Sequence, residues 1–197
     1  MAQRPTWAWD IEATEWDRVV CVVARSTAGD REAFYGADSL ERMAEVMQKA
    51  GGNWIAHAGG IYDTLLLSNV WPRPWPGLVM AGSAVLTAKD GPFKARDSFR
   101  WWLAGLGAVG KYLEKVEQAK PEGERAAKGR WLKLEVDRHR IEDLTADETL
   151  SYCDRDVEIL LEGVNQATAY LDSQGARTAW TAGASALNLL AAIEPLS

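Results

Sequence analysis

The chain has 197 residues, of which 47% are hydrophobic and 25% are charged, as in globular proteins rather than disordered ones. Its formal net charge of −6 argues against a protein that coats nucleic acid through bulk positive charge. Two cysteines are too few for a disulfide scaffold or a cysteine-rich zinc site. Residues 141–197 hold 10 acidic and 2 basic side chains, so we expect any polyanion site before residue 141, apart from metal-binding carboxylates.

Apolar patterning predicts both strands and helices along the chain. Short apolar or β-branched runs predict strands at residues 6–11, 18–24, 33–36, 53–57, 84–88 and 92–97. Apolar residues at helical spacing predict helices at residues 39–50, 61–69, 101–117, 144–172 and 182–193, with Gly105, Gly107 and Gly110 as points where the third could break near its start. Asp90-Gly91 predicts a hairpin turn, Thr145 with Glu148 predicts a helix-capping box, and the polar stretch 119–130 predicts a mobile loop. This order of elements predicts an α/β domain with a mixed sheet.

The ends of the chain and its hydropathy bear on its location. No run of about 18 apolar residues is present, so no membrane span is predicted. Charged residues come too early at the N-terminus for a signal peptide. We expect one domain over residues 1–197 in the cytoplasm, with a core at about 6–175 and a helical segment at about 182–194.

The first chemical motif is Asp10-Ile11-Glu12, at the end of a predicted strand. Residues two apart on a strand point to the same face, so the two carboxylates lie side by side. Like charges so close repel unless a cation lies between them, and carboxylate oxygens favour Mg²⁺ or Mn²⁺. The alternative is an exposed acidic strand end.

Two further motifs carry carboxylates. Tyr152 and Asp156 are four residues apart on a predicted helix and share one face, where a phenol and a carboxylate can hold a water; the alternative is scattered surface charge. Gly59-Gly60 allow a close backbone approach before Asp63, which begins a predicted helix; the alternative is simple N-capping.

In this order, the three motifs resemble the 3′–5′ exonuclease domain of family B DNA polymerases, among the DnaQ-like exonucleases of ribonuclease H-like fold. The family motifs D-x-E, aromatic-Asp and Y-x-x-x-D are matched by Asp10 and Glu12, Tyr62 and Asp63, and Tyr152 and Asp156. Tyr152 assigns the likeness to the tyrosine subclass of that family.

The likeness is greatest to the protein-primed polymerases of bacteriophages and linear plasmids. Four further segments match their patterns: HAGGIYD at 57–63, LKLEVD at 132–137, Asp97-Ser98 after a hairpin, and TAGASAL at 181–187. The likeness spans about residues 6–190. Ala58 stands where relatives often have Asn, and Ala13 where they often have Thr; both changes concern the grip on substrate.

The resemblance implies an α/β, ribonuclease H-like fold with an inserted β-hairpin, and 3′–5′ exonuclease activity on single-stranded DNA. It implies two divalent cations, Mg²⁺ or Mn²⁺, bound by Asp10, Glu12, Asp63 and Asp156. Tyr152 would orient the attacking water, and Lys133 would contact a phosphate oxygen. Candidates for gripping the terminal nucleotides are His57, Tyr62, Leu66, Ser98 and Phe99, although Leu66 and Phe99 also fit a core role.

Other functions stay open. The chain lacks the catalytic segments of a polymerase, so the expected partner, besides a DNA 3′ end, is a separate polymerase subunit or a missing polymerase domain. A phage- or plasmid-encoded protein in a host cell would fit. The alternatives are a non-catalytic or weakly active module of the same fold, which binds nucleic acid or docks a polymerase, and an exoribonuclease.

Overall fold

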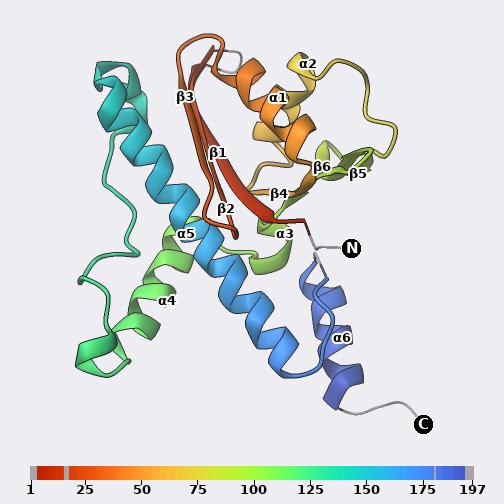
Figure 1. The fold of residues 1–197 in the computed structure, drawn as a ribbon, viewed down its shortest axis with the longest axis vertical. Coiled ribbons are helices and arrows are strands. Elements are labelled where there is room, and N and C mark those ends of the chain that lie inside the picture. The colour runs from red at the N-terminus through yellow and green to blue at the C-terminus, as the bar shows by residue number, and fades with distance from the viewer. Residues whose placement is uncertain (1–3, 16–17, 180, 194–197) are drawn as a thin grey trace.

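A computed structural model describes residues 4–15, 18–179 and 181–193, and over these residues seven strands form a single sheet (Figure 1). The strands are β1 (Thr6–Glu15), β2 (Arg18–Ser26), β3 (Arg31–Tyr35), β4 (Gly52–Ala56), β5 (Val79–Ala81), β6 (Ala84–Asp90) and β7 (Phe93–Asp97). The helices are α1 (Ser39–Ala50), α2 (Asp63–Val70), α3 (Phe99–Trp102), α4 (Leu106–Gln118), α5 (Ala146–Ser173) and α6 (Ala182–Ile193), with short 3₁₀ turns at Glu122–Glu124 and Arg138–Asp143.

The sheet is mixed, and β1 lies near its centre. Its strand order is β3-β2-β1-β4-β7-β6-β5. β1 pairs with β4 in parallel and with β2 antiparallel, and β4 pairs with β7 in parallel. β6 and β7 form the predicted antiparallel hairpin around Asp90-Gly91. The α/β fold with a mixed sheet and an inserted hairpin is therefore confirmed, and it is the architecture expected of a ribonuclease H-like domain.

Helices cover both faces of the sheet. Successive side chains of β1 point to opposite faces, and each face packs against a layer of helices. Trp7, Trp9 and Ile11 point into an apolar layer under α1 and α2, where the indoles of Trp7 and Trp54 stack 4.6 Å apart. The intervening residues face the other layer, which is formed mainly by α4 and α5. Asp10 and Glu12 belong to this second set, so burial of the tryptophans fixes the direction of the two carboxylates.

The long helix α5 packs across β1 and β2 (Figure 1). It begins at the predicted capping box, in which the Thr145 hydroxyl accepts from the Glu148 N–H and the Glu148 carboxylate accepts from the Thr145 N–H. Among the residues that the structure describes, no helix has both the length and the apolar character needed to cross a bilayer.

Several predicted elements differ from the structure. The helical stretch expected at 101–117 is two helices, α3 and α4, broken near its start as its glycines allowed, and the break lies at Leu103, which adopts a left-handed backbone with φ 52°. The stretch 119–130 contains a 3₁₀ turn and is fastened to α4, since the Glu117 carboxylate accepts from the Ala126 N–H at 2.8 Å. β5 was not predicted. Of the expected domain and its terminal helix, residues 1–3 and 194–197 lie outside the described part.

Candidate metal and nucleic-acid site

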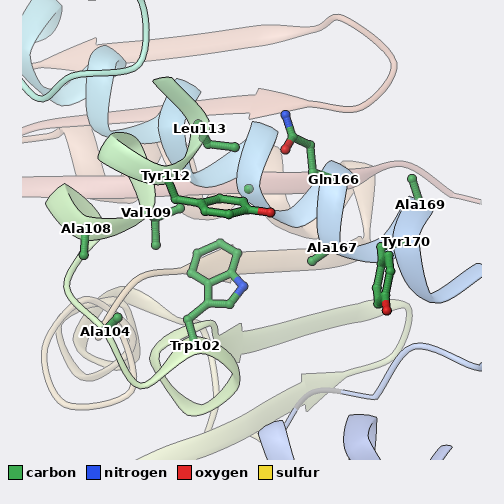
Figure 2. Close-up of a pocket in the computed structure, with 11 residues that line it drawn as sticks. Trp102, Ala104, Ala108, Val109, Tyr112, Leu113, Gln166, Ala167, Ala169 and Tyr170 are labelled. Atoms are coloured by element: carbon green, nitrogen blue, oxygen red, sulfur yellow. The ribbon is translucent and has the colours of Figure 1, made fainter. Parts of the chain in front are cut away.

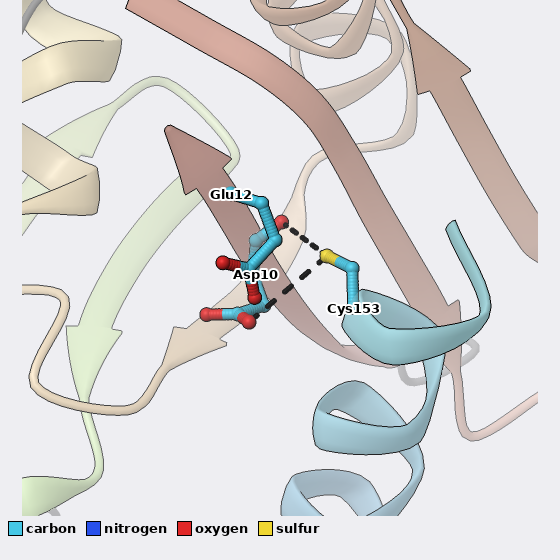
Figure 3. A group of neighbouring side chains, drawn as sticks. All are labelled: Asp10, Glu12 and Cys153. Carbon is cyan, nitrogen blue, oxygen red and sulfur yellow. Dashed lines mark hydrogen bonds between the residues drawn. The ribbon is translucent and has the colours of Figure 1, made fainter. Parts of the chain in front are cut away.

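Asp10 and Glu12 lie side by side on the face of β1 that α5 covers (Figure 3). Glu12 is buried, and Asp10 is partly exposed at the floor of a cleft. Cys153 of α5 joins them: its Sγ lies 3.4 Å from the backbone oxygen of Asp10 and 4.0 Å from Oδ2. Ligand atoms of the three side chains lie within 4.8 Å of one another, so this group could hold a metal ion.

α5 carries Tyr152 and Asp156 one helical turn apart, as their spacing predicts, and Asp156 lines the same cleft. Both are buried, at 2% and 3% exposure. The Lys133 ammonium forms an ion pair with the Asp156 carboxylate and lies 5.7 Å from the centre of the Tyr152 ring. The ammonium of Lys133 thus brings a positive charge to the cluster of site carboxylates, from a segment outside the sheet.

Asp63, the first residue of α2, approaches from the opposite side and is 4% exposed. The turn before it is tight, because Ala58 has φ 58° and a Cβ on Gly60 would collide with the backbone oxygen of Val85. The Gly60 carbonyl accepts from the Val85 N–H at 2.7 Å. The glycine pair therefore does what its sequence suggests, since it lets the chain pass close to the hairpin strand and present Asp63.

Asp97, at the end of β7, holds this turn in place. Its carboxylate accepts from the backbone N–H groups of Gly60 at 3.3 Å and Phe99 at 2.9 Å, and from that of Ala58. Burial raises the Asp97 pKa, although these three hydrogen bonds oppose the rise. Neither Asp97 nor Cys153 was among the predicted site residues; the only signal for Asp97 was its place in the Asp-Ser pair after the hairpin.

The electrostatics link the carboxylates into one group. Burial raises the pKa of Asp10 well above its usual value, Glu12 and Asp156 raise it further, and Lys133 lowers it. Burial, followed by the charge of Asp10, raises the pKa of Asp63 well above its usual value. Oxygen ligands that resist ionisation through mutual repulsion are suited to a hard divalent cation, which would relieve that repulsion. The residues present therefore fit the expected cations.

One cavity of about 500 Å³ lies at this site. Its lining includes the four predicted metal ligands and Lys133, together with His57, Tyr62 and Phe99. The rings of His57 and Phe99 pack edge to face, with their centres 5.8 Å apart. The Nδ1 atom of His57 is hydrogen-bonded to the Ser98 hydroxyl at 2.9 Å. Burial and the charge of Lys133 lower the His57 pKa to about 4, so the ring is neutral at pH 7.

The five candidate nucleotide contacts do not all face this cavity. His57, Tyr62 and Phe99 line it, and 37% of Phe99 is exposed and available for stacking. Ser98 is fully buried behind His57, where its hydroxyl also donates to the Ala56 carbonyl. Leu66 is 5% exposed and packs in the layer under α1 and α2, which is its core role.

A second cavity, of about 670 Å³, lies between α3, α4 and α5 (Figure 2). Aromatic rings of Trp102, Tyr112 and Tyr170 line it, together with small apolar residues and Gln166. Its lining holds no acidic side chain, so it lacks the ligands for the chemistry of the first cavity.

Comparison with known proteins relates the fold to polymerases. No family model and no curated protein matches the chain. Among solved structures, phi29 DNA polymerase complexed with single-stranded DNA is similar, with a TM-score of 0.62 and 17% identity over 96% of this chain. The same polymerase with primer-template DNA gives 0.60 and 18% over 96%. The family B DNA polymerase of Pyrobaculum calidifontis gives 0.57 and 13% over 88%.

This chain spans 35% of the phi29 polymerase chain and 25% of the archaeal one. At such low identity the likeness shows a shared fold, a domain architecture found within family B DNA polymerases.

Proposed function

We propose that this protein is a metal-dependent 3′–5′ exonuclease that hydrolyses the terminal phosphodiester of single-stranded DNA. The observation that carries the proposal is the convergence of Asp10, Glu12, Asp63 and Asp156 on one cavity. Tyr152 lies one helical turn before Asp156 on α5. Domains of this fold occur in polymerases whose solved complexes contain single-stranded or primer-template DNA, which supports DNA as the substrate.

The chain's own residues account for binding and orientation. Asp10, Glu12, Asp63 and Asp156 would hold two divalent cations, Mg²⁺ or Mn²⁺, which would supply an activated water and stabilise the leaving oxygen. The Tyr152 hydroxyl orients the water, and Lys133 offsets negative charge on the phosphate. The exposed ring of Phe99 stacks on a terminal base, while neutral His57, fixed by Ser98, offers a hydrogen bond.

The domain assignment belongs to the same proposal. Residues 6–175 form the exonuclease core, and α6 forms an additional helical segment. Its partner is a polymerase, as a separate subunit or as a domain outside this sequence.

The direct test is degradation of a 5′-labelled oligonucleotide in Mg²⁺ or Mn²⁺. Glu12→Gln removes one metal-binding charge at nearly constant volume, and we expect it to lower the rate at least about 100-fold. Glu45→Gln is the matched control, because Glu45 lies on the exposed face of α1, and it should keep the wild-type rate. Equal rates for the two variants would rule out the assignment.

An RNA oligonucleotide of the same sequence runs in parallel. Faster degradation of RNA would favour an exoribonuclease, since stacking and phosphate contacts serve both polymers.

One observation favours a second candidate, a weakly active or non-catalytic binding module. Ala58 occupies a left-handed position in the turn before Asp63, and its methyl group offers no hydrogen bond to a bound strand. Titration calorimetry with Mn²⁺ distinguishes the candidates. Binding that is lost in Glu12→Gln supports the exonuclease, whereas no binding up to about millimolar concentrations supports the module.

A further inference from the structure

Lys133 enters the cleft from residues 125–137, which form neither helix nor strand. Such a segment lacks the repeating hydrogen bonds that fix a side chain borne by a sheet or a helix. Its position must therefore come from contacts with its neighbours, α4 and α5.

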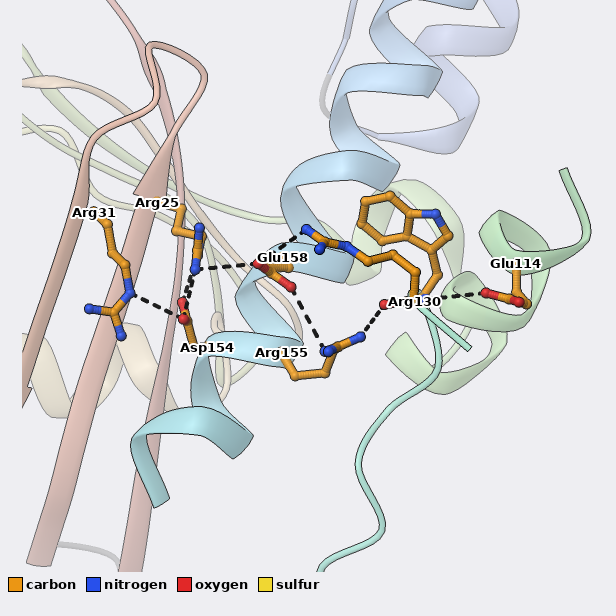
Figure 4. A network of polar contacts seen from close by, with 8 residues as sticks. Arg25, Arg31, Glu114, Arg130, Asp154, Arg155 and Glu158 are labelled. Atoms are coloured by element: carbon orange, nitrogen blue, oxygen red, sulfur yellow. Dashed lines mark hydrogen bonds and ion pairs between the residues drawn. The ribbon is translucent and has the colours of Figure 1, made fainter. Parts of the chain in front are cut away.

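Glu114 of α4 supplies the first of these contacts. Its Oε1 accepts from the Gly129 N–H at 2.7 Å, and its Oε2 accepts from the Trp131 N–H at 3.3 Å. Figure 4 shows Glu114 on α4 beside Arg130. One carboxylate thus holds two backbone donors just before Lys133. Hydrogen bonds to a charged acceptor are stronger than neutral ones, so this is a firm attachment.

Gly110 supplies the second, through the absence of a side chain. A Cβ at Gly110 would collide with the backbone oxygen of Trp131, so the segment rests directly on the α4 backbone. One turn earlier, a Cβ at Gly107 would meet the Lys133 side chain at 3.7 Å, an ordinary contact. Glycine is costly inside a helix, and at Gly110 the close approach gives a reason for it.

α5 holds the segment from the other side (Figure 4). The Arg155 guanidinium donates to the Arg130 carbonyl, and the Arg130 side chain pairs with Glu158 at 3.4 Å. Arg155 lies one residue before Asp156, the partner of Lys133. The segment is therefore attached to the same helix that bears Tyr152 and Asp156.

We propose that Glu114 and Gly110 are positioning residues, which fix residues 129–131 against α4 so that the Lys133 ammonium is held at Asp156 beside Tyr152. The effect on turnover rests on the proposed exonuclease function; the placement of Lys133 does not.

The placement is tested without activity, by acetylating the metal-free protein with an amine-reactive ester and measuring the modification of Lys133 by mass spectrometry. In the wild type the Lys133 side chain is 22% exposed and paired, so its reaction is slow. Glu114→Gln and Gly110→Ala should each raise the rate of Lys133 acetylation about fivefold. This is the effect expected when one strong hydrogen bond is lost, or when the segment no longer packs directly on the α4 backbone. Exposed Lys49 of α1 serves as the internal reference.

Matched controls distinguish the loss of the segment's attachment to α4 from a general destabilisation of the fold. Gly107→Ala makes the same change one turn away on α4, and Glu45→Gln makes the same charge change on α1; neither should raise Lys133 labelling. An unchanged rate in Glu114→Gln, which keeps the size of the side chain, overturns the proposal even where Gly110→Ala fails to fold.

The effect on turnover is tested by a double-mutant cycle. Glu114→Gln should lower kcat about tenfold with KM within about twofold, and it should cause no further loss in a Lys133→Ala background. Equal losses in both backgrounds would assign Glu114 a purely structural role. An inactive wild type with increased labelling in Glu114→Gln would refute the exonuclease function and leave the placement standing.

Discussion

At the scale of single residues, burial of the site carboxylates costs stability in the absence of a cation. The pKa of Asp63 is raised well above that of an unfolded aspartate, mainly by burial and then by Asp10. Its contribution to stability is therefore present below the unfolded pKa and is lost as pH rises through the folded one. In the metal-free protein, Asp63→Asn should raise the melting temperature at pH 8 by several degrees, and this gain should shrink towards pH 4.

Thermal melts in EDTA and in Mn²⁺ check this prediction. Added Mn²⁺ should stabilise the wild type more than Asp63→Asn, because a ligand that binds the folded state raises its stability. Asp147→Asn changes an exposed acid in the first turn of α5 and should show neither effect. A metal-free Asp63→Asn protein that melts below the wild type at pH 8 would contradict the electrostatic account.

Sequence patterns were informative about residues where the local geometry is regular. The spacing of two on β1 and of four on α5 predicted correctly that Asp10 and Glu12 share one face and that Tyr152 and Asp156 share another. Cys153 and Asp97 were missed because their importance depends on what packs against them. The proximity of Cys153 to Asp10 is a contact between segments 143 positions apart, which no local spacing reveals.

At the scale of elements, the position of the break between α3 and α4 is the main departure from expectation. Leu103 has φ 52° and is 65% exposed, so it holds a strained backbone without burying its side chain. Leu103→Gly should stabilise the protein by about 1 kcal/mol, since left-handed backbone costs a non-glycine residue roughly that much. Urea unfolding measures the gain. Ala104→Gly is the control, and a gain of the same size there would show that strain at Leu103 is not the cause.

Element types were predictable where apolar periodicity is strong, as in α1, α5 and the strands β1 and β2. The glycines at 105, 107 and 110 indicated that the helix could break near its start, but they did not place the break at Leu103, because leucine rarely adopts a left-handed backbone. The expectation of a mobile loop at 119–130 rested on polarity alone. The Ala126 and Gly129 N–H groups donate to side chains of α4, a tertiary arrangement that polar composition does not encode.

At the scale of the whole molecule, the negative charge and the proposed substrate are compatible if binding is local. Two divalent cations would offset the charge of four site carboxylates in full, and the acidic side chains of residues 141–197 other than Asp156 then need not contact DNA. A protein that binds only the end of a strand contacts few phosphates, whereas a protein that coats the strand contacts many. The salt dependence of binding distinguishes these situations, because each neutralised phosphate adds to its slope.

We therefore expect a shallow salt dependence for single-stranded DNA. With Ca²⁺ replacing Mg²⁺ to limit cleavage, the logarithm of affinity should fall with the logarithm of salt at a slope of about −2, as for roughly three phosphate contacts at about 0.7 each. Fluorescence anisotropy with strands of about 8 and about 30 nucleotides should give similar slopes, because contacts beyond the 3′ end are few. A markedly steeper slope for the longer strand would mean that DNA follows an extended basic path. The inference from the net negative charge to local binding at the 3′ end would then be wrong.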